Sequence, residues 1–238
     1  MNPTPPQPFL TATPDDAIPH ISREKVFIED RVFLINRPGE ADRVGQHPAL
    51  LEAKKVDDYM PYWTDLWPAS RMMAKAILRE PWQDFPVRAS DKIEALEIGC
   101  GLGLPGLAAL AVGLRVIFSD YDETAVRFAA DNARLNGFKD FRTLPFDWRY
   151  PPTDLKVPVI LASDLTYELR NIEPILALIR TLLLPGGVCL LTDQDRTPAS
   201  QLRQRLGELG FKYTKEMMRA GEPGGQRVKG TLYRIRLV

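Results

Sequence analysis

The sequence predicts an α/β fold: a doubly wound, mostly parallel sheet with helices on both faces. From residue 93 onward, short apolar runs alternate with amphipathic helical patterns. A glycine-rich loop follows the first apolar run directly, and acidic residues follow the next ones. Because parallel strands end at one edge of a sheet, these residues should form a single ligand site there.

The composition allows one large domain with an extension. The chain has 238 residues, 45% of them hydrophobic, and its 31 basic and 31 acidic residues cancel. A neutral chain has no overall field for nucleic acid or an anionic membrane, so we expect neither as a partner. No apolar run reaches the length of a membrane span, and the N-terminus lacks the layout of a signal peptide.

The cysteines and histidines indicate a reducing compartment and no metal site. Cys100 lies in the glycine loop and Cys189 in a predicted strand, positions typical of reduced thiols. His20 and His47 have no cysteine partners nearby in the sequence. We therefore expect a cytoplasmic protein without a metal, and we expect it to be a monomer.

Several stretches precede the alternating region. Residues 1–20 hold six prolines and few large apolar side chains, so we interpret them as a flexible Pro-rich tail. Residues 26–28 and 32–35 are apolar runs with a polar turn between them and predict a β-hairpin. The hairpin and a following helix make an N-terminal extension at 21–90, ahead of the ligand-binding domain at 91–238.

The second unusual stretch is aromatic. Tyr59, Tyr62, Trp63 and Trp67 precede a helix predicted at about 69–79. Packing against the hairpin is an equally good explanation for the first three. Trp67 is the better functional candidate, because the proline that follows it can start the helix.

The glycine loop is the central feature of the chain. Residues 93–98 read as a buried strand, and Gly99, Gly101, Gly103 and Gly106 follow without a spacer. Glycine tolerates positive φ, and its missing Cβ lets a ligand approach the backbone closely. The loop therefore predicts a nucleotide-like ligand.

Two ligand classes fit this loop. The pattern of Gly101, Gly103 and Gly106 also matches a dinucleotide site, with Asp120 about twenty residues on, where a ribose-binding acid is expected. Glu97 at the strand end favours S-adenosylmethionine, because a carboxylate can meet that cofactor's cationic amino-acid end. The same acid would repel a pyrophosphate.

The remaining elements follow in order, each strand run leading into a polar residue. Strands are predicted at 115–119, 141–144, 157–162 and 188–192, with helices between them and a last helix beginning at 197–198. Asp120, Asp147 and Asp164 come just after the ends of three of these strands. Residues 211–217 and 228–237 predict a final antiparallel strand pair.

The run from Leu96 to Gly106 resembles the cofactor motif of seven-β-strand, S-adenosylmethionine-dependent methyltransferases, which have a Rossmann-like sheet. Three further features resemble the protein-lysine methyltransferase group called methyltransferase family 16: Leu-Trp-Pro-Ala at 66–69, Asp-Trp at 147–148, and Asp-x-x-Tyr at 164–167. The stretch at 61–68 is also similar to lysine methyltransferases that act on the electron-transfer flavoprotein β subunit.

The resemblance implies roles for particular positions. Trp67 would border the cofactor, Asp120 would bind the ribose hydroxyls, and Trp148 would lie along the adenine. Ser163 would contact the cofactor near its sulfonium, and Gly99 and Gly101 would line its methionine end. Gly103 would be a further cofactor-binding residue. Glycine often follows the tryptophan in that group, whereas Arg149 stands here.

The resemblance also implies an N-methyltransferase that acts on lysine in a protein substrate. A lysine must lose its proton first, since its ordinary pKa is about 10.4. Asp164 could orient the incoming ammonium and Tyr167 could desolvate it, with Glu168 as a weaker third candidate. The alternatives are that Asp164 caps the next helix and that Tyr167 only packs.

Three other functions remain open at this point. A small-molecule amine could be the acceptor on the same fold. A nicotinamide-dependent oxidoreductase would share the glycine pattern, although Glu97, the Asp-Trp pair and the terminal strand pair argue against it. A cofactor-binding module without catalysis is the third.

Overall fold

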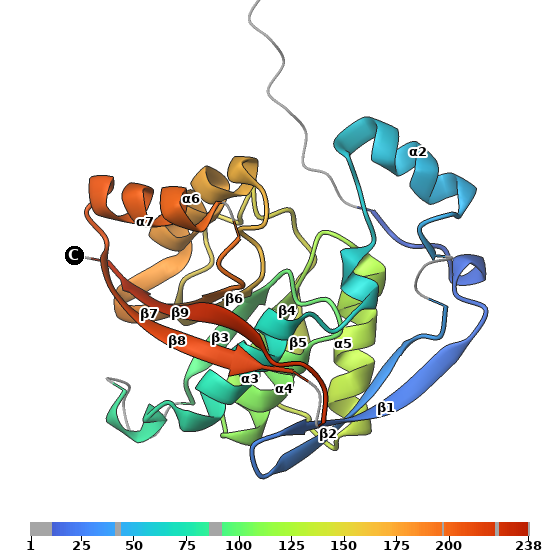
Figure 1. Ribbon diagram of the computed structural model, residues 1–238, viewed down its shortest axis with the longest axis horizontal. Helices are drawn as coiled ribbons and strands as arrows, with labels where there is room; N and C mark the ends of the chain where they lie inside the picture. The colour runs from blue at the N-terminus through green and yellow to red at the C-terminus, as the bar shows by residue number, and fades with distance from the viewer. Residues whose placement is uncertain (1–10, 41–43, 86–91, 197, 222–223, 238) are drawn as a thin grey trace, which may run out of the picture.

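The computed structural model describes residues 11–40, 44–85, 92–196, 198–221 and 224–237 (Figure 1). Its main sheet has seven strands in the order β5-β4-β3-β6-β7-β9-β8. The strands are β3 (Glu94–Ile98), β4 (Arg115–Ser119), β5 (Phe141–Thr143), β6 (Val157–Ser163), β7 (Leu183–Asp193), β8 (Lys212–Ala220) and β9 (Val228–Arg236). The first five are parallel, and β9 runs antiparallel to both β7 and β8. The predicted Rossmann-like sheet with an antiparallel C-terminal pair is confirmed.

Helices cover both faces of this sheet. The described α-helices are α2 (Pro48–Asp57), α3 (Pro68–Arg79), α4 (Leu104–Ala111), α5 (Glu123–Leu135), α6 (Ile172–Leu182) and α7 (Ala199–Glu208). None of them is long and apolar enough to cross a membrane. Helix α7 begins at Ala199, and Thr197, the predicted cap, lies outside the described residues.

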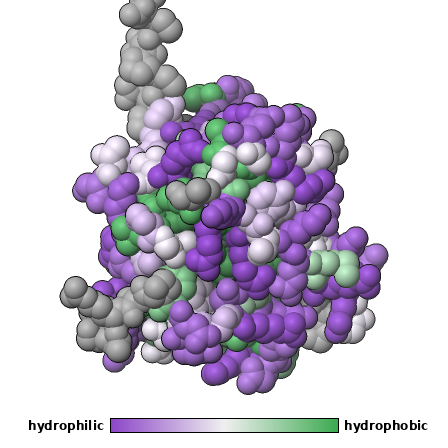
Figure 2. Space-filling view, turned by 90° about the vertical axis from the view of Figure 1, so that its left-hand side faces the viewer, coloured by the Kyte–Doolittle hydropathy of each residue, from purple (hydrophilic) through white to green (hydrophobic). Residues whose placement is uncertain are grey.

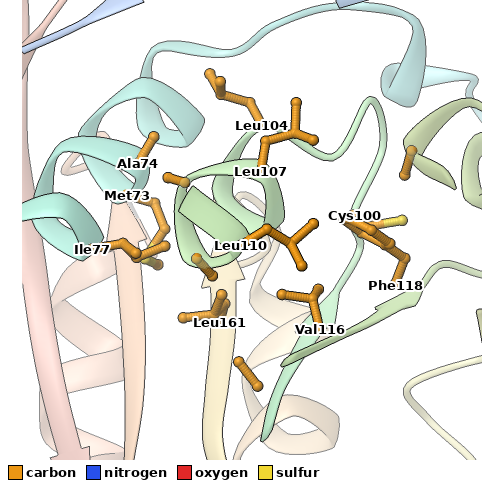
Figure 3. Close-up of a cluster of buried hydrophobic side chains, with 14 of the residues drawn as sticks. Met73, Ala74, Ile77, Cys100, Leu104, Leu107, Leu110, Val116, Phe118 and Leu161 are labelled. Atoms are coloured by element: carbon orange, nitrogen blue, oxygen red, sulfur yellow. The ribbon is translucent and has the colours of Figure 1, made fainter. Parts of the chain in front are cut away.

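Side chains at alternating positions of the strands pack into two separate hydrophobic cores. Leu161 of β6 packs with α3 and α4, whereas its neighbour Ile160 packs with α6 and α7. Figure 3 shows part of the first core, with Met73 and Ile77 of α3, Leu107 and Leu110 of α4, and Leu161 of β6. Both faces are therefore buried, which explains why the parallel strands read as continuous apolar runs.

The predicted hairpin is also confirmed, as β1 (Ile21–Ile28) and β2 (Arg31–Pro38). Asn132 of α5 and Asn136, the C-cap of that helix, hold the hairpin to the domain. Asn132 Oδ1 accepts the backbone N–H of Asn36 at 2.7 Å, and Asn136 Oδ1 accepts that of Leu34 at 2.9 Å. These side-chain amides satisfy backbone groups on the open edge of β2.

Residues 11–20 do not behave as the predicted flexible tail. Thr11 pairs with the strand end after β4: its N–H donates to the Tyr121 carbonyl at 3.0 Å, and its carbonyl accepts the Glu123 N–H at 2.9 Å. Thr13 is buried beside Asp122. Composition missed this because the contacts join residues more than one hundred positions apart. Residues 1–10 of that prediction lie outside the described residues.

Charged side chains protect the β8 edge of the seven-stranded sheet. Strand β8 is the outer strand, and it carries the exposed residues Lys212, Lys215 and Arg219. Such side chains discourage pairing with a strand of another molecule. Figure 2 views the left-hand side of Figure 1, and the surface there is mainly hydrophilic, with hydrophobic side chains in separate patches.

Candidate active site

A pocket of about 310 Å³ lies at the carboxyl ends of β3, β4 and β6. The structure brings nine of the ten predicted site residues together around it: Trp67, Gly99, Gly101, Gly103, Asp120, Trp148, Ser163, Asp164 and Tyr167. Glu97 does not line it. Tyr121 and Arg196 line the pocket as well and were not predicted to do so. Tyr62 and Trp63, for which packing and function were equal alternatives, also line it.

The glycine loop has the backbone that only glycine adopts easily. Gly99, Gly101 and Gly103 have φ values of +59°, +50° and +83°. A Cβ at Gly99 would lie 2.5 Å from Leu165 Cδ2 and 3.1 Å from Trp148 Cζ3. Side chains here would both strain the backbone and fill the floor of the pocket, so the main chain stays open to a ligand.

Glu97 lies behind the loop, not in front of it. Its Oε2 accepts the backbone N–H of Gly106 at 2.9 Å, which joins the end of β3 to the start of α4. Burial raises the pKa of Glu97 well above its usual range. Its Oε1 is buried and has no hydrogen-bond partner among the described residues. Direct contact between Glu97 and the cofactor stays a prediction.

Asp120 holds the loop and faces the pocket. Its Oδ2 accepts the Gly101 N–H at 3.1 Å and its Oδ1 the Asp122 N–H at 3.2 Å. Burial raises the pKa of Asp120 to about 7. Each carboxylate oxygen can accept a second bond, so ribose hydroxyls remain possible donors.

Asp122, two residues on, serves another purpose. It caps α5 by accepting the Thr124 N–H at 2.8 Å. It also accepts bonds from Thr13, from Trp63 Nε1 at 3.0 Å and from the Tyr59 hydroxyl. The residue is fully buried, so this carboxylate joins two N-terminal segments to the cofactor end of β4.

Aromatic rings form two walls of the pocket. Tyr62 packs edge-on against Trp67 and Tyr167, with ring centroids 5.9 Å and 5.5 Å apart. At the other end, the rings of Tyr121 and Trp148 lie 6.2 Å apart. One wall can desolvate an acceptor amine, and the other offers flat apolar faces to an adenine.

Arg149, the departure from the family pattern, braces the second wall from outside. Its guanidinium binds both carboxylate oxygens of Asp57, at 2.8 Å and 2.6 Å, and also binds Asp147. The residue that replaces glycine thus ties α2 to the loop that carries Trp148.

Asp164 sits at the end of β6 in a left-handed backbone conformation, with φ of +58°. Its carboxylate accepts bonds from Arg196 and Gln194, while the N-cap of α6 is Asn171. The alternative that Asp164 caps the next helix is therefore wrong. Tyr167 is not only a packing residue, since it lines the pocket, and burial raises its pKa to about 12.

These residues fit S-adenosylmethionine, the cofactor that the sequence predicts. The bare loop backbone at Gly99 would accept its methionine end, Asp120 would accept hydrogen bonds from its ribose, and Trp148 would border its adenine. Aromatic faces such as Trp67 also tolerate a neighbouring sulfonium.

Comparisons with known proteins agree with this geometry. Residues 62–204 match the family model described as lysine methyltransferase. The chain is 38% identical over 93 residues to a ribosomal protein L11 methyltransferase from Photobacterium profundum, covering 39% of this chain and 30% of that one. It is 33% identical over 107 residues to a histidine protein methyltransferase 1 homolog from Dictyostelium discoideum, covering 42% and 35%. The chain thus spans about a third of the length of these relatives.

Solved structures show the same fold at low sequence identity. A ribosomal protein L11 methylase from Lactobacillus delbrueckii superposes with a TM-score of 0.52 at 20% identity, over 76% of this chain and 92% of that one. A putative RNA methyltransferase from Pyrococcus horikoshii gives 0.56 at 17% identity, over 74% and 89%. Since the family model spans more than half of the sequence, the chain belongs to the lysine methyltransferase family, whose cofactor is S-adenosylmethionine.

Proposed function

We propose that this protein is an S-adenosylmethionine-dependent N-methyltransferase that methylates lysine in a protein substrate. The observation that carries the proposal is one continuous pocket. It runs from the glycine loop, whose backbone would contact the cofactor, to Asp164 and Tyr167, where an acceptor amine would enter. The relatives' names, which refer to ribosomal protein L11 and to a histidine protein, support a protein acceptor.

The chain's residues would act mainly by positioning. When bound, S-adenosylmethionine supplies a methyl group that a neutral amine accepts by forming an N–C bond as the C–S bond breaks, its electron pair remaining on sulfur. Asp164 would accept a hydrogen bond from the amine, and Tyr62, Trp67 and Tyr167 would exclude water around it. Aromatic walls also disfavour the ammonium form, because they replace its hydration.

A labelled-methyl assay tests this proposal. Purified protein and labelled S-adenosylmethionine are incubated with a fractionated lysate, and in parallel with the small-molecule extract of the same cells. Label in a protein band, located on lysine by mass spectrometry, is the expected result. Label only in the extract would support the small-molecule alternative, and label on histidine would change the acceptor residue.

Two controls separate catalysis from contamination and from mere binding. Asp164→Asn should bind S-adenosylmethionine in calorimetry but transfer little label. Wild-type protein that binds the cofactor and labels neither fraction would favour a binding module without catalysis. We further propose that the protein is cytoplasmic and monomeric; the reduced, buried Cys100 and Cys189 support the first, and light scattering tests the second.

A further inference from the structure

The carboxylate proposed to meet the acceptor is already paired with a cation. Asp164 Oδ1 accepts Arg196 Nη1 at 2.8 Å, and Oδ2 accepts Gln194 Nε2 at 2.5 Å and Arg196 Nη2 at 3.2 Å. Asp164 is only 8% exposed. A carboxylate has about four acceptor positions, so one position on Oδ1 stays available to a further donor.

Contacts of both its side chain and its backbone hold Arg196 in place at the pocket. Its guanidinium carbon lies 5.8 Å from the ring centroid of Trp67, and both residues line the pocket. Its backbone N–H donates to Asp193 Oδ1 at 3.3 Å. The next-door Asp195 accepts the Thr231 hydroxyl at 2.7 Å, which anchors the same loop to β9.

A lysine acceptor must be in its neutral amine form, and an unpaired carboxylate would favour the ammonium form instead. A free carboxylate within about 4–6 Å of an amine stabilises the ammonium form, yet methyl transfer needs the neutral lone pair. A guanidinium at the same distance has the opposite effect, because two like charges repel. The pair of Asp164 and Arg196 is an acceptor of hydrogen bonds without net charge.

We propose that Arg196 makes the acceptor site selective for neutral amine over ammonium: it cancels the charge of Asp164 and leaves Oδ1 to accept an N–H bond from the amine. The amine's lone pair is then free to point at the methyl group, and its proton is left in bulk water on entry. This proposal rests on the proposed function and assigns Arg196 a positioning role in it.

The other charged groups around the site do not replace this effect. Asp65 Oδ1 lies 3.5 Å from Arg37 Nη1. Asp120 accepts a backbone N–H of the glycine loop, and Asp193 accepts the Thr166 hydroxyl at 2.6 Å. Asp65 is paired with a cation, whereas Asp120 and Asp193 accept hydrogen bonds from neutral donors. Arg196 is the only cation among the described residues that line the pocket. The other titratable groups of the pocket lining are the hydroxyls of Tyr62, Tyr121 and Tyr167 and the thiol of Cys100.

The pH dependence of amine binding tests the proposal without turnover. The probe is Nα-acetyl-lysine methylamide, titrated into cofactor-free protein and followed by NMR between pH 7 and 9. In wild type, affinity should rise about tenfold for each pH unit, as the neutral fraction does below a pKa of about 10.4. In Arg196→Gln the affinity should stay nearly flat, because Asp164 would then bind the ammonium.

Two matched variants define the cause. Arg196→Lys keeps a cation beside Asp164 and should keep the steep pH dependence. Arg219→Gln removes an exposed arginine on β8 and should match wild type. In the labelled-methyl assay, the acid limb of the pH–rate profile should move to higher pH in Arg196→Gln alone, while calorimetry shows unchanged cofactor affinity.

Several results would overturn the proposal. Affinity that is flat with pH in wild type would do so even if Arg196→Gln failed to fold. Equal pH dependence in wild type and Arg196→Gln, with a lower Tm in the variant, would show a structural ion pair only. If either result is found while the protein still methylates a protein substrate, the role of Arg196 is refuted and the proposed function stands. If the protein neither binds the probe nor labels any substrate, the proposed function and the role of Arg196 are both refuted.

Discussion

Asp122→Asn is the sharpest test of how the N-terminal segments are attached. Oδ1 of Asp122 accepts the backbone N–H groups of Thr13 and Thr124, and an asparagine oxygen can keep both. Oδ2 accepts the Thr13 hydroxyl at 2.6 Å, Trp63 Nε1 at 3.0 Å and the Tyr59 hydroxyl. The asparagine amide would instead present its own N–H groups to these donors.

The cost follows from the bonds that cannot be remade. Losing the bonds from Tyr59 and Trp63 to a charged partner would cost roughly 1.5–3 kcal/mol each, so about 3–6 kcal/mol together. The Thr13 hydroxyl lies 3.2 Å from the Tyr59 oxygen and 3.3 Å from Trp63 Nε1, so it can accept one donor. We therefore expect the free energy of unfolding to fall by about 3 kcal/mol.

Urea unfolding at pH 7 measures this loss, with Asp131→Asn as the matched control. Asp131 is an exposed carboxylate of α5 paired with Arg134 at 2.7 Å, and its change should stay within about 0.5 kcal/mol. Cofactor affinity should fall as well, since the Trp63 backbone lies against Gly101. A loss below about 1 kcal/mol for Asp122→Asn would refute the reasoning, because the buried donors would then have found other partners.

Three further predictions concern the pocket. Gly101→Val should abolish cofactor binding in calorimetry while the thermal transition persists, because φ of +50° does not suit a branched side chain; unchanged affinity would contradict the loop assignment. Asp120→Ala should weaken the cofactor by roughly 1.5–3 kcal/mol. Because the folded pKa of Asp120 is about 7 and the unfolded value about 3.9, folded wild type binds more protons between these values. Its stability should therefore fall as pH rises through this window, and calorimetric scans of Asp120→Ala should lack that slope. Asp164→Asn should lower methyl transfer at least tenfold, about 1.4 kcal/mol in the barrier, with little change in cofactor affinity; full turnover would show that the acceptor contact lies elsewhere.

The sequence determined the parts of this protein that depend on local chemistry. The strand before the loop, the glycines with positive φ and the acid at the end of β4 are each specified within a few residues, and all lie where they were predicted. The final antiparallel pair was also predictable, because two strand patterns and a glycine-containing loop adjoin each other. The periodicity of hydrophobic residues and the residue types in turns are sufficient to predict such features.

Only the tertiary structure decided which side chains meet. Arg196 and Asp164 are 32 positions apart, and Thr13 and Asp122 are 109 apart, so no periodic pattern links them. The sequence placed Glu97 correctly at a strand end, yet the pleat directs its carboxylate to Gly106 behind the loop. Residues 11–20 have the composition of a tail, but buried hydrogen bonds to Asp122 and Tyr121 hold part of them in place. The charge of the proposed acceptor site is decided in the same way, because pairing in a buried pocket depends on distance in space and not on residue type alone.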